Sequence, residues 1–222
     1  MGVVPPKDGF LKGLRNITKK HGALLIIDEV ITGFRLRYGS AQQVLGVQGD
    51  LTTMGKIIGG GVPVAAYAGS AELMNNVAPL GPVYQAGTLA GNPLAMRAGI
   101  ASLKELSKPG LYEGIAELAK KLVAGFRKAL SEAGIAAQVN ALGSLSTIFF
   151  APQPVQNYAD AKRSDTKLYA RFFREMLQRG IFLAPSQFEA AFVSASHTPA
   201  DIDRTISAAS DALKTIAAQP NK

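Results

Sequence analysis

The stretch ALLIID, residues 23–28, decides the fold class of this chain. An unbroken apolar run that ends in an acid is typical of a strand buried on both faces of a parallel sheet. Just upstream, residues 8–21 place Leu11, Leu14 and Ile17 on one helical face and end at a glycine, which predicts a helix. A helix that leads into a buried strand predicts the α/β fold class.

The segment after this strand is expected to carry the chemistry. A long, glycine-rich connection separates it from a second predicted strand at residues 62–68, and Lys56 lies near the end of that connection. Loops that follow the strands of an α/β sheet meet at one edge of the sheet, where such proteins bind their ligands. Lys56 is therefore a candidate functional residue.

The chain is expected to divide into two domains at Pro109-Gly110. This dipeptide ends a helix predicted over 92–106, so that residues 1–108 form one domain and residues 109–222 a smaller α+β domain. After the boundary, apolar residues recur every three or four positions, which is typical of an amphipathic helix. The further elements predicted in this domain are strands at 137–139, 146–151, 181–184 and 190–194, a helix over 165–179, and a last helix with Thr198 as its N-cap.

The composition excludes several classes of function. The chain has 222 residues, 47% hydrophobic and 18% charged, a mixture that can bury a core. Its net charge is +8, but the basic residues are spread along the chain, so no nucleic-acid partner is expected. No apolar run is long enough to cross a bilayer and the first residues lack a secretion signal. We therefore expect no membrane partner and a cytoplasmic location.

Metal, thiol and nucleotide chemistry are not expected either. The chain has no cysteine, which excludes disulfides, thiolate catalysis and zinc fingers. Its two histidines, His21 and His197, stand far apart in the sequence without the spacing of metal ligands. No GxGxxG fingerprint, Walker loop or GxSxG elbow supports a dinucleotide, a nucleoside triphosphate or a serine-hydrolase mechanism.

Three segments remain as candidates, and each has a structural alternative. Asp28 and Glu29 follow the buried strand, where a carboxylate can hold a cationic ring nitrogen or simply cap a helix. Lys56 stands among apolar neighbours before three glycines, a setting that suits an amine for imine formation but also an ordinary lysine at a strand edge. Gly87 and Thr88 precede a predicted helix and can either donate to a phosphate or form an ordinary loop.

Together these segments resemble the class III branch of the pyridoxal-phosphate enzymes. The elements DEVITGFR, residues 28–35, and GKIIGGG, residues 55–61, are common throughout that branch and do not specify the reaction. The stretches YQAGTL, residues 84–89, and FEAAFVSASHT, residues 188–198, are similar to the aminomutases of the branch that act on glutamate-1-semialdehyde. The resemblance covers nearly the whole chain.

The resemblance implies a partial fold type I large domain, followed by the smaller α+β domain, and pyridoxal 5'-phosphate as the cofactor, with pyridoxamine 5'-phosphate in the cycle. Lys56 is implied to bind the cofactor covalently and to move protons. Asp28 is implied to pair with the pyridinium nitrogen, which keeps the ring protonated and able to accept electrons. Gly87 and Thr88 resemble residues that contact the cofactor phosphate of the neighbouring subunit in a homodimer.

The remaining implied residues concern the substrate. Tyr84 and Glu189 resemble groups that line the pocket of a small-molecule substrate, with Glu189 near its amino group. The implied reaction moves the amino group of glutamate-1-semialdehyde to give 5-aminolevulinate, a precursor of tetrapyrroles. A class III aminotransferase is the alternative activity.

The chain departs from the resembled family in its length. Family members carry, before the equivalent of Met1, a further segment about as long as this chain, which supplies most of the sheet and half of the cofactor site. Two explanations stay open: a fragment of an aminomutase, or a genuine truncated product that dimerises or holds cofactor without catalysis. An open reading frame upstream of the Met1 codon favours the first, and an in-frame stop favours the second. Either way, we expect residues 1–222 alone to be inactive.

Overall fold

The computed structural model describes residues 1–219, which form two compact units. The N-terminal unit comprises Lys7–Tyr112, and the C-terminal unit comprises Glu113–Lys222 together with Met1–Pro6. The first residues join the C-terminal unit through hydrogen bonds from the Gly2 N–H to the Phe188 carbonyl (2.7 Å) and from the Val3 N–H to the Thr147 hydroxyl (2.9 Å). The predicted boundaries, 1–108 and 109–222, place these first residues in the N-terminal domain instead. The assignment of two domains stays a prediction.

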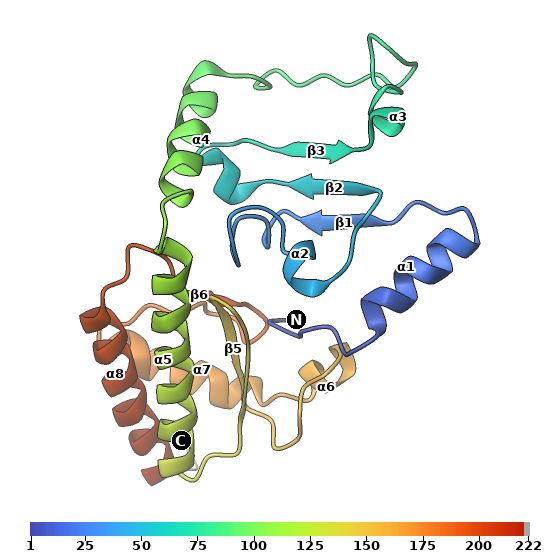
Figure 1. Ribbon diagram of the computed structural model, residues 1–222. Helices are drawn as coiled ribbons and strands as arrows, with labels where there is room; N and C mark the ends of the chain where they lie inside the picture. The colour runs from blue at the N-terminus through green and yellow to red at the C-terminus, as the bar shows by residue number, and fades with distance from the viewer. Residues whose placement is uncertain (220–222) are drawn as a thin grey trace. The chain divides into compact units, whose positions relative to one another are not determined.

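The N-terminal unit is built on a three-stranded sheet in the order β1-β2-β3. Strand β1 pairs in parallel with β2, and β2 pairs antiparallel with β3, as the arrows in Figure 1 show. The elements of this unit are α1 (Phe10–Lys20), β1 (Ile26–Glu29), α2 (Gln42–Leu45), β2 (Leu51–Met54), the 3-10 helix η1 (Lys56–Gly59), β3 (Ala66–Gly69), α3 (Ala71–Met74) and α4 (Pro93–Leu106).

The predicted elements of this unit are present, but strand β2 and the short helices α2, η1 and α3 were not predicted. The helices over 8–21 and 92–106 and the strands at 23–28 and 62–68 correspond to α1, α4, β1 and β3. Strand β2 was not predicted, because Thr52 and Thr53 interrupt its apolar pattern and glycines flank it. This omission matters because β2 is the parallel partner of β1.

The expectation that residues 23–28 are buried on both faces is wrong for this chain. Ile26 and Leu24 are 57% and 53% exposed. Side chains alternate between the two faces of a strand, so Ile26 and Asp28 share one face while Ile27 and Glu29 share the other. The second face is covered, since a Cβ on Gly49 would lie 2.7 Å from the Ile27 side chain and Glu29 is 1% exposed. The described residues leave the first face open.

Glu29 holds the covered face of the sheet in place. Its carboxylate accepts hydrogen bonds from the backbone N–H groups of Ala41 (2.8 Å) and Gln42 (3.1 Å), where α2 begins, and from the hydroxyls of Ser40 and Thr32. Burial by itself raises the pKa of Glu29, but the hydrogen bonds from Ser40, Ala41 and Gln42 outweigh it and hold the pKa below its ordinary value. The sequence offered helix capping as an alternative for the pair of acids, and Glu29 adopts it.

Gln42 extends this network to the neighbouring strand. Its side-chain amide donates to the Thr52 hydroxyl (3.0 Å), and its side-chain oxygen accepts from the Gly49 N–H (2.7 Å). Glu29 and Gln42 therefore tie the end of β1 to β2 by side-chain hydrogen bonds in addition to the backbone ladder.

The C-terminal unit contains the hydrophobic core. An antiparallel sheet in the order β4-β5-β6 packs with long helices, and the bulky side chains that are fully buried include Phe149, Phe172, Met176, Ile202 and Leu213. Its elements are β4 (Gln138–Leu142), β5 (Leu145–Phe149), α6 (Tyr158–Lys162), α7 (Thr166–Gln178), β6 (Ala191–Phe192) and α8 (Pro199–Ala218), together with α5 (Leu111–Glu132), which begins at the end of the N-terminal unit.

Most predicted elements of this unit are confirmed, but the strand at 181–184 is wrong. Two of its backbone groups bond to helix α7: the Ile181 N–H donates to the Met176 carbonyl (3.0 Å), and the Ala184 carbonyl accepts from the Tyr169 hydroxyl (2.6 Å). The Ile181 N–H is committed to α7 in this way and cannot donate to a neighbouring strand. The predicted N-cap Thr198 is confirmed, and it forms a capping box with Asp201.

Removing the Phe172 ring is expected to destabilise the C-terminal unit by about 3–5 kcal/mol, because Phe172 is fully buried and truncation to alanine leaves a cavity. The matched control is Phe182→Ala, since Phe182 is 76% exposed, and its expected cost is under about 1 kcal/mol. Urea unfolding followed by far-ultraviolet circular dichroism measures both. Equal losses of free energy of unfolding would contradict the assigned core.

The variant Glu29→Gln is expected to loosen the start of α2, because an amide has one acceptor oxygen where the carboxylate has two. Losing hydrogen bonds to a charged group costs about 1–3 kcal/mol, or roughly 5- to 150-fold faster amide exchange at Ala41 and Gln42 near pH 6. Glu72→Gln in α3 is the control, since Glu72 is exposed. Unchanged exchange at Ala41 and Gln42 would refute the role given to Glu29.

The same carboxylate predicts a pH dependence. Because the folded-state pKa of Glu29 is lowered, its contribution to stability is complete above the ordinary glutamate pKa of about 4.3 and is lost as the pH falls through the lowered pKa. Protection of the Ala41 and Gln42 amides, corrected for intrinsic exchange, should therefore fall in acid in the unmodified chain. In Glu29→Gln it should be low throughout, and an identical acid profile in the two chains would contradict this origin.

Candidate active site

The structure brings two predicted site residues, Asp28 and Lys56, to one edge of the N-terminal sheet. Asp28 lies opposite Thr53 in the parallel register, and Lys56 follows two residues after the end of β2. Parallel strands present their carboxyl ends at the same edge, so an acid at the end of β1 and an amine just beyond β2 meet there. The β1 and β2 arrowheads in Figure 1 point to this edge, where η1 begins.

Asp28 is oriented by two donors. One of its oxygens, Oδ1, accepts from the Val30 N–H (2.9 Å) and from the Thr53 hydroxyl (3.2 Å). Among the described residues no hydrogen bond reaches the other oxygen, and the side chain is exposed. A carboxylate oriented in this way can accept a hydrogen bond from a cationic ring nitrogen. Thr53 was missed as a site residue because the strand that carries it was not predicted.

Lys56 has an unusual backbone conformation. Its φ is 48°, in the left-handed region that residues other than glycine rarely adopt, and its side chain is exposed. Such conformations cost of order 1–3 kcal/mol and concentrate at functional sites. The strain supports Lys56 as a functional residue without assigning its role. An ordinary lysine at a strand edge would also have an exposed side chain, but that alternative does not explain the left-handed backbone conformation of Lys56.

One of the three glycines after Lys56, Gly60, is required by helix packing. A Cβ on Gly60, whose φ is 58°, would lie 2.6 Å from the Ala98 carbonyl oxygen of α4. In the reverse direction, a Cβ on Gly99 would lie 2.5 Å from the Ile58 carbonyl oxygen. Helix α4 therefore approaches the backbone of η1 so closely that larger residues are excluded at both positions. The backbone that approaches Gly60 so closely is a helix of the chain itself.

Tyr84, Gly87 and Thr88 lie in an exposed segment before α4. Tyr84 is 83% exposed, and the Gly87 carbonyl accepts from the Ala90 N–H (2.9 Å) in a turn. No hydrogen bond between described residues joins the three to Asp28 or Lys56. The structure thus does not bring this segment together with the edge residues, and its cofactor contact across a subunit interface stays a prediction.

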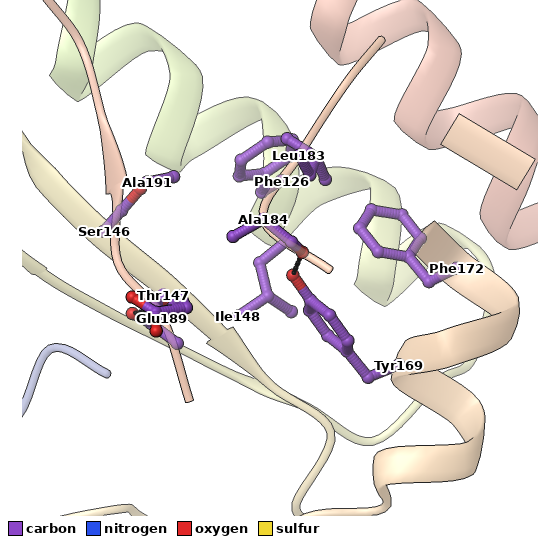
Figure 2. A pocket seen from close by; sticks show the side chains of 10 residues that line it. All are labelled: Phe126, Ser146, Thr147, Ile148, Tyr169, Phe172, Leu183, Ala184, Glu189 and Ala191. Atoms are coloured by element: carbon purple, nitrogen blue, oxygen red, sulfur yellow. Dashed lines mark hydrogen bonds between the residues drawn. The ribbon is translucent and has the colours of Figure 1, made fainter. Parts of the chain in front are cut away.

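Glu189 belongs to the C-terminal unit, at the margin of an apolar cavity. Figure 2 shows Glu189 beside Thr147, with Tyr169 and Phe172 on the other side of the hollow. The residues that line it are Phe126, Ser146, Thr147, Ile148, Tyr169, Phe172, Leu183, Ala184, Glu189 and Ala191. The Tyr169 pKa is raised by burial first and by the Glu189 charge second. The place of Glu189 in a substrate pocket stays a prediction.

Within residues 1–219, no group of three or more histidine, aspartate and glutamate side chains is arranged to hold a metal ion. Over the same residues, no helix combines the length and apolar character needed to traverse a membrane.

Comparison with known proteins identifies the family of the chain. The family model described as "Aminotransferase class-III" matches residues 1–212. The chain is 58% identical to the glutamate-1-semialdehyde 2,1-aminomutase of Desulforamulus reducens, over 98% of the chain and 50% of that protein. Five further curated relatives that are 53–56% identical are named for the same activity. The chain spans about half the length of the curated relatives it matches.

Solved structures are similar to this chain over nearly all of its length and about half of theirs. An omega-transaminase from Sphaerobacter thermophilus is 38% identical with a TM-score of 0.87, covering 96% of this chain and 49% of that one. A glutamate-1-semialdehyde-aminomutase from Pseudomonas aeruginosa PAO1, in complex with PMP, is 27% identical with a TM-score of 0.84, covering 95% and 48%. Since the family model matches nearly all of its residues, the chain belongs to the class III aminotransferases.

Proposed function

We propose that this chain supplies the catalytic lysine and the ring-nitrogen carboxylate of a pyridoxal-phosphate-dependent glutamate-1-semialdehyde 2,1-aminomutase. The observation that carries the proposal is the placement of Asp28 and Lys56 at the same edge of the β1-β2 pair. The curated relatives at 53–58% identity support the choice of reaction. Since the chain spans about half their length, it would act as one part of that enzyme.

The residues at the edge fit the cofactor. When bound, pyridoxal phosphate supplies an electron sink that stabilises negative charge on the carbon next to its imine nitrogen. Asp28 would accept a hydrogen bond from the protonated ring nitrogen through the oxygen that Val30 and Thr53 leave available. Lys56 would hold the cofactor through its amine, and the freed amine would take and return a proton at the substrate carbons.

The overall reaction is an isomerisation. The amino group leaves the carbon beside the aldehyde of glutamate-1-semialdehyde and ends on the former aldehyde carbon, which gives 5-aminolevulinate with no atom gained or lost. An isomerase therefore needs no second amino acceptor. Tyr84 and Glu189 are proposed to line the substrate pocket, and Gly87 with Thr88 to contact the cofactor phosphate across a homodimer. A cytoplasmic location and a part in porphyrin biosynthesis belong to the same proposal.

A class III aminotransferase is the second candidate. The observation that favours it is the 38% identity to an omega-transaminase of solved structure, against 27% to the solved aminomutase. The elements around Asp28 and Lys56 serve either reaction, so the need for a keto acid separates the two candidates. A truncated product that dimerises or holds cofactor without catalysis remains the alternative for the chain alone.

Labelling tests Lys56 directly. In the chain joined to the half of the Desulforamulus reducens protein that it does not match, borohydride reduction with pyridoxal phosphate should fix the label at Lys56. Lys56→Arg should lose at least about tenfold of the label, because a guanidinium does not form the imine. Lys104→Arg should keep it, since Lys104 is another exposed lysine of the N-terminal unit. Recovery of the label on Lys20 or Lys104 would overturn the assignment.

Substrate requirements test the reaction. The same joined chain should convert glutamate-1-semialdehyde to 5-aminolevulinate without any added keto acid, and adding one should not raise the rate. The measurement is product formation with the enzyme loaded with pyridoxamine phosphate. A strict requirement for a keto acid would decide for the aminotransferase.

A further inference from the structure

Strand β6 is short, and side chains continue its attachment to β5. The backbone ladder between the two strands stops after the pair Ser146 and Ala191. Beyond that pair, the Thr147 hydroxyl donates to the Glu189 carbonyl (3.0 Å). The side-chain amide of the buried Gln187 donates to a further β5 carbonyl (2.7 Å). Side-chain hydrogen bonds therefore hold residues 187–189 against β5 where the ladder has ended.

Thr147 also ties this turn to the first residues of the chain. Its oxygen accepts from the Val3 N–H (2.9 Å), and its hydrogen is donated to the Glu189 carbonyl. A hydroxyl has a single hydrogen to donate and can accept at its oxygen, so both bonds can form at once. Thr147 is 5% exposed, and water is therefore poorly placed to replace either bond. One buried hydroxyl thus satisfies two backbone groups that lie far apart in the sequence.

Gly2 closes the same arrangement from the other side. Its N–H donates to the Phe188 carbonyl (2.7 Å), one residue before Glu189. Its φ is 75°, and a Cβ at this position would lie 2.9 Å from the Thr147 methyl group and 2.9 Å from the Phe149 ring. A side chain therefore does not fit here, because the backbone of this first segment lies directly against β5.

The Glu189 side chain takes its position from this backbone anchor. Among the described residues its carboxylate has no hydrogen-bond partner, and the side chain is exposed. Figure 2 shows it beside Thr147 at the margin of the cavity. We propose that Thr147 is a positioning residue for Glu189, which fixes the point from which the Glu189 carboxylate reaches the substrate. The inference rests on the proposed place of Glu189 in the substrate pocket.

Amide exchange of the 222-residue chain tests the anchor. Thr147→Val removes the hydroxyl but keeps the shape of the side chain, so exchange should rise about 5- to 150-fold at the Val3 amide and at least about threefold at the Glu189 amide. Thr147→Ser keeps a hydroxyl and should restore most of the protection. The matched control is Thr205→Val, which removes a hydroxyl that donates to the Asp201 carbonyl (2.7 Å) in α8 and should leave both amides unchanged. Unchanged exchange in Thr147→Val would overturn the anchor.

Kinetics test what the anchor does for the substrate. In the chain joined to the unmatched half of the Desulforamulus reducens protein, Thr147→Val should raise the KM for glutamate-1-semialdehyde at least about threefold, because a displaced Glu189 binds the substrate less well. The kcat and the Kd for pyridoxal phosphate should change by less than about twofold. Thr147→Ser should bring the KM back, and Thr205→Val should not alter it. Weaker cofactor binding in Thr147→Val would mean a general loss of structure and would overturn the positioning role.

Glu189→Gln separates this inference from the proposed function. If Glu189→Gln raises the KM and Thr147→Val does not, the positioning role is wrong and the proposed substrate pocket stands. If Glu189→Gln leaves the KM unchanged, Glu189 does not serve the substrate, and the proposed pocket and the positioning role are both wrong. Equal increases of KM in Thr147→Val and Thr205→Val would overturn the positioning role alone.

Discussion

The parallel pairing of β1 with β2 is the constraint on which the candidate site depends. Its register sets Asp28 opposite Thr53 and brings Lys56 out just beyond the end of β2. A slip of one residue would exchange the two faces of the strand and turn Asp28 away from Thr53. Glu29 opposes such a slip, because its buried carboxylate accepts four hydrogen bonds that a shifted strand would leave unmade. Glu29 thus fixes the position of its neighbour, Asp28.

The two acids at the end of β1 have different roles. Glu29 points to the covered face and anchors α2, while Asp28 points to the open face and remains accessible. Alternation along a strand makes this division unavoidable, since neighbouring side chains lie on opposite faces. A structural anchor and a candidate ligand group can therefore be adjacent in sequence without competing for the same partners.

Stability is distributed unevenly between the two units. The C-terminal unit buries large aromatic and aliphatic side chains between its sheet and its helices, whereas the N-terminal unit depends more on hydrogen bonds and on the close contact of η1 with α4. Few buried apolar contacts give low local stability and facile opening. The part of the chain that carries Asp28 and Lys56 is consequently expected to open more readily than the C-terminal unit.

The sequence by itself determined the fold class, the long helices, most strands, and the identity of Asp28 and Lys56 as candidates, because these features follow from local periodicity and from short motifs. It did not reveal β2, since Thr52 and Thr53 hide the strand, and it misjudged residues 181–184, whose backbone groups bond to α7. Which of the adjacent acids is buried, which glycine meets a helix, and which side of the sheet is open were decided only by tertiary structure. Each depends on residues far apart in the chain, and no local pattern encodes their contacts.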